Sequence, residues 1–388
     1  MAGGFDSGNL GDYASFSGLV NVLKSHNLSP DFVHFSRHPR DSFAWEFPFV
    51  KQIQNLDWAT SAEAEGKMLQ GFNRGDPGDR LSILAQEIEA SDVLLIGNGR
   101  LLVDYSLGRA RGPLAYFSLL SSLATVSNTP YVIWSMTLVE PRSKRGGELL
   151  AQIVRGAKFL FLRDSDSAQI AVKYGASPSR VRVVPDFAWA MSREPLKPDS
   201  RHSHQFAENN LKMRVGINFR AISAEARMAI SQQARVLGKI VDVVDFTAVA
   251  QQHYLDPGGA DANDDETNRE VMTSLGLEAS GVRDQLLSLA DLCQVYDDLN
   301  VLVTTRRHGM IIAATRGLPS VLWALEENTR RVMEDYPVEG IVGPRPAPIE
   351  LHELRSAVEK RADVLEHADS EKHKLESSVA PEELLGIE

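Results

Sequence analysis

The chain alternates between short apolar runs and longer amphipathic stretches, and this alternation constrains its fold more than any other feature. Eight runs rich in Val, Ile, Leu and Phe have the length of buried strands: residues 92–96, 131–135, 159–162, 181–184, 213–219, 239–246, 301–304 and 320–324. Continuous apolar strands separated by helical segments are typical of parallel sheets covered on both faces. The sequence therefore predicts an α/β chain of doubly wound architecture.

Length and one break in the pattern indicate two domains. The chain has 388 residues, and residues 192–211 are polar, carry two prolines and show no strand pattern, so we interpret them as a linker. We expect a Rossmann-like domain over residues 1–195, a second over residues 196–345, and a charged helical tail over residues 346–388.

Charge and cysteine content exclude several classes of protein. The net charge of −11 argues against general affinity for nucleic acid, so an anionic ligand must be held by a local cluster of cations. The acidic residues 256–267 are expected to form an exposed loop. Cys293 is the one cysteine, which allows no internal disulfide and favours a reducing cytoplasm. No apolar run is long enough to span a bilayer, and residues 1–12 lack the pattern of a secretory signal.

The most informative segment is residues 301–324, VLVTTRRHGMIIAATRGLPSVLWA. A strand ends at Arg306, Arg307 and His308, and a short helix is expected from residue 310 to residue 316. Ligands of open α/β sheets bind beyond the carboxyl ends of strands, where the next helix presents free N–H groups. If strand geometry continues, Arg306 and His308 point to the same side, and a guanidinium with an imidazole suits a phosphate or carboxylate. The alternative is that the arginines are solvated and His308 caps the helix.

A second candidate is the turn at residues 8–12, GNLGD, which precedes an apolar helix-like run at residues 13–23. Its glycines permit close backbone approach, and the helix start again supplies N–H donors. Asp12 is either a helix cap or a general base.

Further polar residues follow strands in the same way. Arg163 comes after residues 159–162, and it could reach a cleft between the domains or pair with Asp164 or Asp166. Arg220 follows residues 213–219. A strand-end arginine is expected to contribute little to the core.

Several other site classes are not supported by the motifs. The turn at residues 97–99, GNG, lacks the third glycine and the acidic partner of a dinucleotide fingerprint. His202 and His204 have no third ligand nearby, so no metal site is expected. Neither a GxSxG elbow nor a P-loop occurs.

Taken in order, GNLGD, GNG, FLRDSDS, VVPD, GINFR and TTRRHGMIIAATRGLPSV resemble the polysaccharide pyruvyl transferase family over about residues 7–335. The resemblance implies a GT-B-like fold, in which two Rossmann-like domains face a cleft. It also implies transfer of pyruvate from phosphoenolpyruvate onto a sugar of a cell-surface polysaccharide or its precursor, as a cyclic ketal. The N-terminal domain would hold the acceptor, a glycan or lipid-linked sugar, which leaves peripheral membrane association open.

Residue roles follow from the resemblance. The substrate-binding residues would be Arg306, Arg220, Gly309, Asn9, Gly11 and Arg163. His308 would bind phosphate and act as the acid, because an imidazole beside an anion is favoured in its charged form. Asp12 would be the base for the sugar hydroxyl. Neither a cofactor nor a metal is required by this scheme.

The sequence departs from the family pattern in three places. Only residues 1–7 precede GNLGD, where family members carry a full strand, so the first strand is either very short or truncated. The lysine that family members carry after the Gly-x-Pro strand is absent, and only Arg330 or Arg331 could take its place. The glycine-rich turn of the family is also absent near residue 136, where the sequence reads WSMTL. Two other functions stay open: a GT-B glycosyltransferase using a nucleotide sugar, and a glycan-binding homologue without activity.

Overall fold

The computed structural model describes residues 1–3, 5, 8–36, 41–54, 66, 67, 69, 70, 74, 79–104, 107, 112–193, 212–220, 224–252, 264–277, 288–324, 339–342 and 349–386. Most of the expected linker and the positions of His202, His204, Arg330 and Arg331 lie outside these residues. The chain divides into two compact units. Unit 1 contains Met1–Asp6, Val20–Phe187 and His373–Glu388, and unit 2 contains Ser7–Leu19 and Ala188–Lys372.

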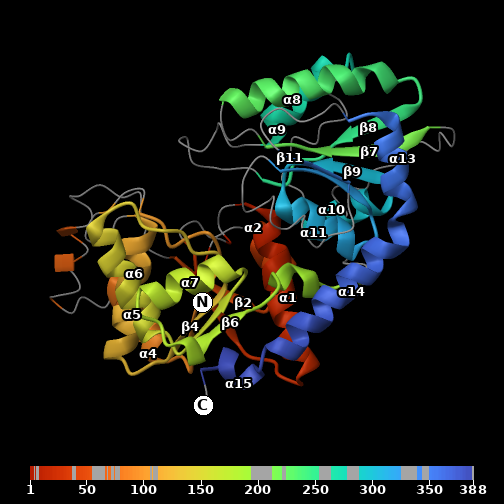
Figure 1. Cartoon of the computed structure of the whole chain (residues 1–388). Helices are drawn as coiled ribbons and strands as arrows, with labels where there is room; N and C mark the ends of the chain where they lie inside the picture. Colours follow the sequence, from red (N-terminus) through yellow and green to blue (C-terminus); the bar gives the residue numbers. More distant parts are fainter. Residues whose placement is uncertain are drawn as a thin grey trace. The chain divides into compact units, whose positions relative to one another are not determined.

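Unit 1 is built on a parallel sheet (Figure 1). Its strands are β1 (Phe32–Ser36), β2 (Val50–Gln54), β3 (Leu94–Gly99), β4 (Tyr131–Met136), β5 (Phe159–Leu162) and β6 (Val181–Val183). They pair in the orders β1-β2 and β3-β4-β5-β6, and Ala2 forms parallel bridges to Phe35 and Ile96. Ala2 thus lies between β1 and β3 and connects them.

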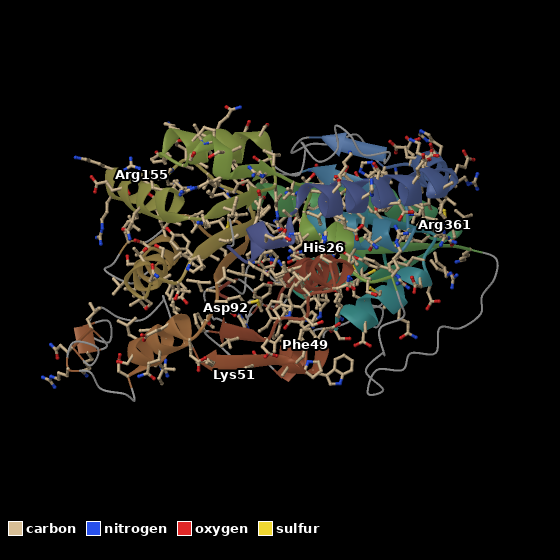
Figure 2. All side chains as sticks on the ribbon, turned by 90° about the horizontal axis from the view of Figure 1, so that it is seen from below. His26, Phe49, Lys51, Asp92, Arg155 and Arg361 are labelled. Carbon is tan, nitrogen blue, oxygen red and sulfur yellow. The ribbon has the colours of Figure 1, made fainter. Side chains whose placement is uncertain are left out.

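The helices of unit 1 are α2 (Asp41–Glu46), α4 (Arg80–Glu89), α5 (Pro113–Val126), α6 (Lys144–Gly156), α7 (Ser165–Lys173) and α15 (Pro381–Leu384). Helices α4, α5 and α6 pack in succession, and α7 packs on β5 and β6. The core gathers apolar side chains such as Leu84, Phe117, Ile133 and Ile153. The surface carries Lys51 and Arg155, while Phe49 is half exposed (Figure 2).

Unit 2 contains a five-stranded parallel sheet in the order β11-β10-β9-β7-β8. The strands are β7 (Met213–Asn218), β8 (Val244–Ala248), β9 (Val301–Thr304), β10 (Ser320–Ala324) and β11 (Glu339–Val342). The helices are α8 (Ala224–Leu237), α9 (Asp264–Ser274), α10 (Leu289–Asp297), α11 (Arg307–Thr315) and α13 (Leu351–Glu359). Helices α8 and α9 lie on one side of the sheet and α10 and α11 on the other (Figure 1).

Two helices contribute residues to both units. Helix α1 (Leu10–Ser25) belongs to unit 2 as far as Leu19, and α14 (Arg361–Ser378) belongs to unit 2 as far as Lys372. The predicted C-terminal helices are confirmed, with Leu354 and Val364 fully buried on their narrow apolar face. The units change after Phe187 and after Lys372, whereas the expected boundaries were residues 195 and 345, and the N-terminal turn from Ser7 to Leu19 belongs to unit 2.

Each unit is a parallel α/β fold of Rossmann type, as predicted. All eight predicted strands occur, although β8 begins at Val244 because residues 238–240 form a 3₁₀ turn. Strands β1, β2 and β11 were not predicted from the sequence. It was also wrong to treat residues 256–267 as an exposed loop throughout, because Asp264 begins α9 with its side chain fully buried.

Candidate functional site

The carboxyl ends of β7 and β9 form the topological switch point of unit 2. From β7, the chain continues to β8 on one side, whereas β9, β10 and β11 follow on the other. Ligands of open α/β sheets bind at such points, where the connections leave in opposite directions. Asn218 and Thr304 end the two strands as register partners, and the Thr304 Oγ1 donates to Asn218 Oδ1 at 2.9 Å.

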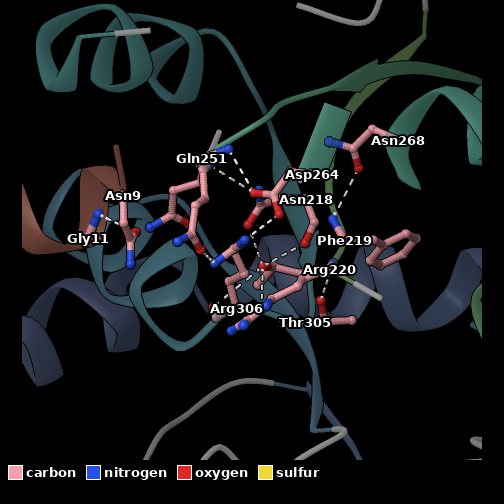
Figure 3. Close-up of polar contacts among 12 residues, drawn as sticks. Asn9, Gly11, Asn218, Phe219, Arg220, Gln251, Asp264, Asn268, Thr305 and Arg306 are labelled. Atoms are coloured by element: carbon pink, nitrogen blue, oxygen red, sulfur yellow. Dashed lines mark hydrogen bonds and ion pairs between the residues drawn. The ribbon is translucent and has the colours of Figure 1, made fainter. Parts of the chain in front are cut away.

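Arg306 lies at this point with its side chain buried. Its Nη1 donates to Gln252 Oε1 at 2.9 Å, and its Nη2 forms an ion pair with Asp264 Oδ1 (Figure 3). Its Nε is buried and has no hydrogen-bond partner among the described residues. Arg306 is therefore part of the core of unit 2, which corrects the expectation that a strand-end arginine contributes little to it.

Asp264 holds three segments together. Its Oδ2 accepts hydrogen bonds from the backbone N–H groups of Gln251 at 2.9 Å and Gln252 at 3.1 Å, while Oδ1 faces Arg306. Burial raises the pKa of the Asp264 carboxyl, and the charge of Arg306, these hydrogen bonds and the charge of Arg220 act in the opposite direction. The charges of Arg306 and Arg220 therefore both act on the Asp264 carboxylate, an anion that belongs to the protein itself.

Arg220 follows β7 and is only partly buried. Its backbone N–H donates to Thr305 Oγ1 at 2.8 Å, which ties it to the end of β9. Its Nε, like that of Arg306, is buried without a hydrogen-bond partner in the part of the chain that the structure describes. Two adjoining strand ends therefore each offer a guanidinium N–H that a ligand could use.

Helix α11 begins directly beside these arginines. Strand geometry does not continue to His308, because Arg306 is the N-cap and His308 is the second helical residue. The cap is made without a side-chain hydrogen bond, so His308 is not the helix cap. The first turn of a helix presents N–H groups and a partial positive charge, which favour an anion.

Gly309 lets this first turn lie close to the strand ends. A Cβ on Gly309 would lie 2.7 Å from Asn218 Oδ1, 2.9 Å from Thr304 Oγ1 and 3.1 Å from Gln251 Oε1. Any side chain here would push α11 away from β7 and β9. Gly309 therefore acts through its small size.

The N-terminal turn meets the same site from another part of the chain. Asn9 caps α1, since its Oδ1 accepts from the Gly11 N–H at 3.0 Å, and Leu10 N–H donates to the Gln251 carbonyl at 3.1 Å. Asp12 is thus not the cap; it is a buried residue of the first turn. Gly11 lies against His308, since a Cβ on Gly11 would be 2.4 Å from the imidazole Nδ1.

Arg163 lies in unit 1 and is engaged by protein groups. Its Nε pairs with Asp186 Oδ2 at 2.9 Å and donates to Ser135 Oγ at 3.2 Å, with both charged side chains buried. Asp186 was not among the partners predicted for Arg163, which were Asp164 and Asp166. Asp164 instead caps α7 by accepting from the Ser167 N–H.

The structure therefore brings together seven of the eight expected site residues in unit 2: Asn9, Gly11, Asp12, Arg220, Arg306, His308 and Gly309. Asp264, Gln251 and Gln252 were not predicted from the sequence. The two glutamines come shortly after the end of β8, so the same rule that selected Arg220 and Arg306 could have found them.

No three His, Cys, Asp or Glu side chains within the described residues gather as a metal ion would require. Among the helices described, none combines the length and the apolar character needed to cross a membrane.

Solved structures with a similar fold include UDP-N-acetylglucosamine 2-epimerases. A putative UDP-N-acetylglucosamine 2-epimerase from Listeria monocytogenes has a TM-score of 0.56 at 11% identity, over 100% of this chain and 93% of that one. The MnaA–UDP structure from S. aureus gives 0.55 at 14% identity, over 99% and 92%. The UDP-GlcNAc 2-epimerase from Neisseria meningitidis bound to UDP-GlcNAc gives 0.53 at 12%, over 99% and 95%. These likenesses show a GT-B-like fold.

Comparison with curated protein sequences finds no match. The family model for polysaccharide pyruvyl transferase matches residues 9–323, from the Asn9 cap to the last residues of β10. This match spans most of the chain and includes both helix starts and both arginines of the site. The protein therefore belongs to the polysaccharide pyruvyl transferase family.

Proposed function

We propose that this protein transfers pyruvate from phosphoenolpyruvate onto a sugar of a cell-surface polysaccharide or its precursor, forming a cyclic ketal. The observation that carries the proposal is the pair of buried Nε–H groups on Arg220 and Arg306, which have no partners among the described residues, beside the start of α11. Phosphoenolpyruvate is a compact anion with a phosphate and a carboxylate. Guanidinium groups and a helix N-terminus suit both of these groups.

Arg306 and Arg220 have different roles in this proposal. Arg306 offers its Nε, while Gln252 and Asp264 each already engage one of its two Nη groups. Arg220 has a greater part of its side chain available, and its backbone is fixed to Thr305. Arg220 therefore supplies the main charge to the anion, while Arg306 adds one donor from a fixed position.

His308 and Asp12 carry the proton transfers. His308 gives a proton to the methylene carbon of phosphoenolpyruvate, and the adjacent carbon becomes electrophilic. A sugar hydroxyl attacks that carbon and loses its proton to Asp12. Phosphate then leaves with the electron pair of its C–O bond. A second hydroxyl attacks the same carbon and closes the ring. Its proton passes to His308, and the proton held by Asp12 passes to the released phosphate, so both residues return to their starting states. A positioned acid or base typically contributes about 10²–10⁴-fold in rate.

Two further parts of the proposal concern partners and location. The acceptor is a glycan or lipid-linked sugar, and no cofactor beyond the donor substrate takes part. Cys293 is buried and is the one cysteine of the sequence, so no internal disulfide can form, which suits work in a reducing cytoplasm.

The test mixes the protein, phosphoenolpyruvate and a panel of glycans, and measures released phosphate together with the mass of the glycan. The proposal expects phosphate release that requires a glycan and a product heavier by one pyruvyl ketal. Thermal protection by phosphoenolpyruvate is measured beside protection by UDP-N-acetylglucosamine. Protection by the nucleotide sugar alone would contradict the proposal and favour a nucleotide-sugar enzyme. Protection by phosphoenolpyruvate without turnover on any glycan would favour a binding protein.

A further inference from the structure

Among the described residues of unit 2, Gln251 has an unusual polar environment. Its side chain is fully buried, and neither Oε1 nor Nε2 has a hydrogen-bond partner among the described residues. Buried polar groups in native proteins are nearly always satisfied, and those that are not need a specific explanation. A side chain held in this state costs stability unless a ligand completes its bonds.

The backbone of Gln251 is held on both sides. Its N–H donates to Asp264 Oδ2 at 2.9 Å, and its carbonyl accepts from the Leu10 N–H at 3.1 Å. These bonds to α9 and α1 fix the backbone at Gln251, and the complete burial of its side chain restricts the rotamers that the amide can adopt. Such preorganisation lowers the cost of binding a ligand.

The side chain reaches the start of α11. Its Oε1 would be 3.1 Å from a Cβ on Gly309, so the amide lies directly beside the first turn of this helix (Figure 3). The next residue, Gln252, bonds to Arg306. Gln251 is thus next to the anion site already described.

A buried side-chain N–H donor follows each of three adjacent strands. The order β9-β7-β8 places Arg306, Arg220 and Gln251 at neighbouring carboxyl ends. Arg306 Nε, Arg220 Nε and Gln251 Nε2 are all buried donors without partners in the described part of the chain. An anion at this edge would satisfy all three.

We infer that Gln251 is an anion-binding residue of this site and donates a hydrogen bond from Nε2 to a phosphate oxygen of the substrate. The inference rests on the proposed function, because it places the phosphate of phosphoenolpyruvate here. A neutral amide adds a donor without a third positive charge beside the arginines. Asp264 is the positioning residue that holds Gln251 and Arg306 in register.

The test uses Gln251→Met, which keeps the length of the side chain and removes both polar atoms, and inorganic phosphate as the probe. We expect a melting temperature equal to or above that of the unaltered protein, because an unsatisfied buried amide is removed. We expect phosphate affinity, measured by calorimetry, to fall about tenfold or more, as loss of a hydrogen bond to a charged group predicts. Opposite changes in stability and affinity are the signature of a ligand-binding group.

Gln233→Met is the matched control. Gln233 lies on α8, is buried, and has an Nε2 without a partner among the described residues. Phosphate affinity should stay unchanged in this variant. If Gln251→Met lowers the melting temperature and leaves phosphate affinity intact, the amide is a structural group and the inference is overturned. Unchanged affinity with unchanged stability overturns it as well.

A crystal structure of the unaltered protein with phosphate avoids any dependence on how the variant folds. It should show a phosphate oxygen within hydrogen-bonding distance of Gln251 Nε2. Absence of phosphate from Gln251, or an Nε2 bonded to Asn218 instead, overturns the inference. Phosphate binding is independent of turnover, so a protein that binds phosphate through Gln251 but pyruvylates no glycan would contradict the proposed function alone.

Discussion

The backbone of Gly11 lies directly against the imidazole of His308. A Cβ at Gly11 would be 2.4 Å from Nδ1, 2.5 Å from Cγ and 2.6 Å from Cβ of His308. These residues are almost 300 positions apart in the sequence, and each lies in the first turn of a helix. The contact therefore holds the proposed acid against the turn that carries Asp12, the proposed base.

Gly11→Ala should displace His308 or the start of α1. Overpacking of this kind costs about 1–3 kcal/mol, and the altered imidazole position should lower turnover about tenfold or more. The measurements are urea unfolding and phosphate release. Gly238→Ala is the control, since its nearest neighbour would be 3.8 Å away. Equal activity in the two variants would show that the contact does not position His308.

His308→Gln should separate binding from chemistry. Glutamine keeps a hydrogen-bond donor but cannot deliver a proton near neutral pH, so phosphoenolpyruvate should bind within about tenfold of the unaltered affinity. Single-turnover rate should fall about 10²-fold or more. Melting temperature should change little, because Arg306 and not His308 is the N-cap of α11. A destabilised variant with full turnover would contradict the catalytic role.

Arg306→Ala should destabilise unit 2 strongly. The change removes the ion-pair partner of Asp264, whose side chain is fully buried. Breaking a buried pair in this way costs about 3–5 kcal/mol, as measured by urea unfolding. The control is Arg227→Ala, since Arg227 pairs with Glu270 at 3.0 Å on a partly exposed surface, and its loss should cost about 1 kcal/mol or less. Similar losses in the two variants would mean that the buried pair contributes no special stability.

Arg163→Met tests whether Arg163 binds substrate. Since Asp186 and Ser135 engage its Nε, we expect a loss of stability on the order of 3 kcal/mol. Thermal protection by phosphoenolpyruvate, taken relative to the variant's own melting temperature, should be retained. Loss of that protection would restore Arg163 to the substrate-binding residues.

His34 should make unit 1 sensitive to acid. Burial lowers the pKa of His34 from 6.5 to about 3, so the unfolded chain binds a proton between these values and the folded chain does not. Stability is therefore complete above about pH 6.5 and falls as the pH drops toward 3, by about 2 kcal/mol between pH 7 and pH 5. His34→Phe, which suits the neighbouring rings of Phe5 and Phe43, should flatten this dependence in unfolding measurements.

The control for this prediction is His26→Gln, because His26 is exposed just after α1 (Figure 2). This variant should keep the pH dependence of the unaltered protein. An unchanged slope in His34→Phe would show that other groups dominate the acid sensitivity.

Local patterns in the sequence were enough to predict most of the fold. The apolar runs at residues 131–135 and 301–304 became buried strands because a parallel strand covered on both faces is apolar throughout. Strands β1 and β2 were missed because FVHFS contains two polar residues and VKQIQ is mostly polar without a regular alternation. Short runs of mixed polarity carry too little periodicity to be told from loops.

The sequence by itself also determined which residues could form the site, because Arg220, Arg306 and His308 follow apolar strands and a parallel sheet brings such ends to one edge. Only the tertiary structure decided what each residue does there. Asp264 lies 42 residues from Arg306, yet it takes one of the guanidinium nitrogens, and Gly11 joins His308 from the opposite end of the chain. Strand and helix periodicity reflects near neighbours, whereas the partner of a buried charge is chosen by packing among distant segments, which no local pattern records.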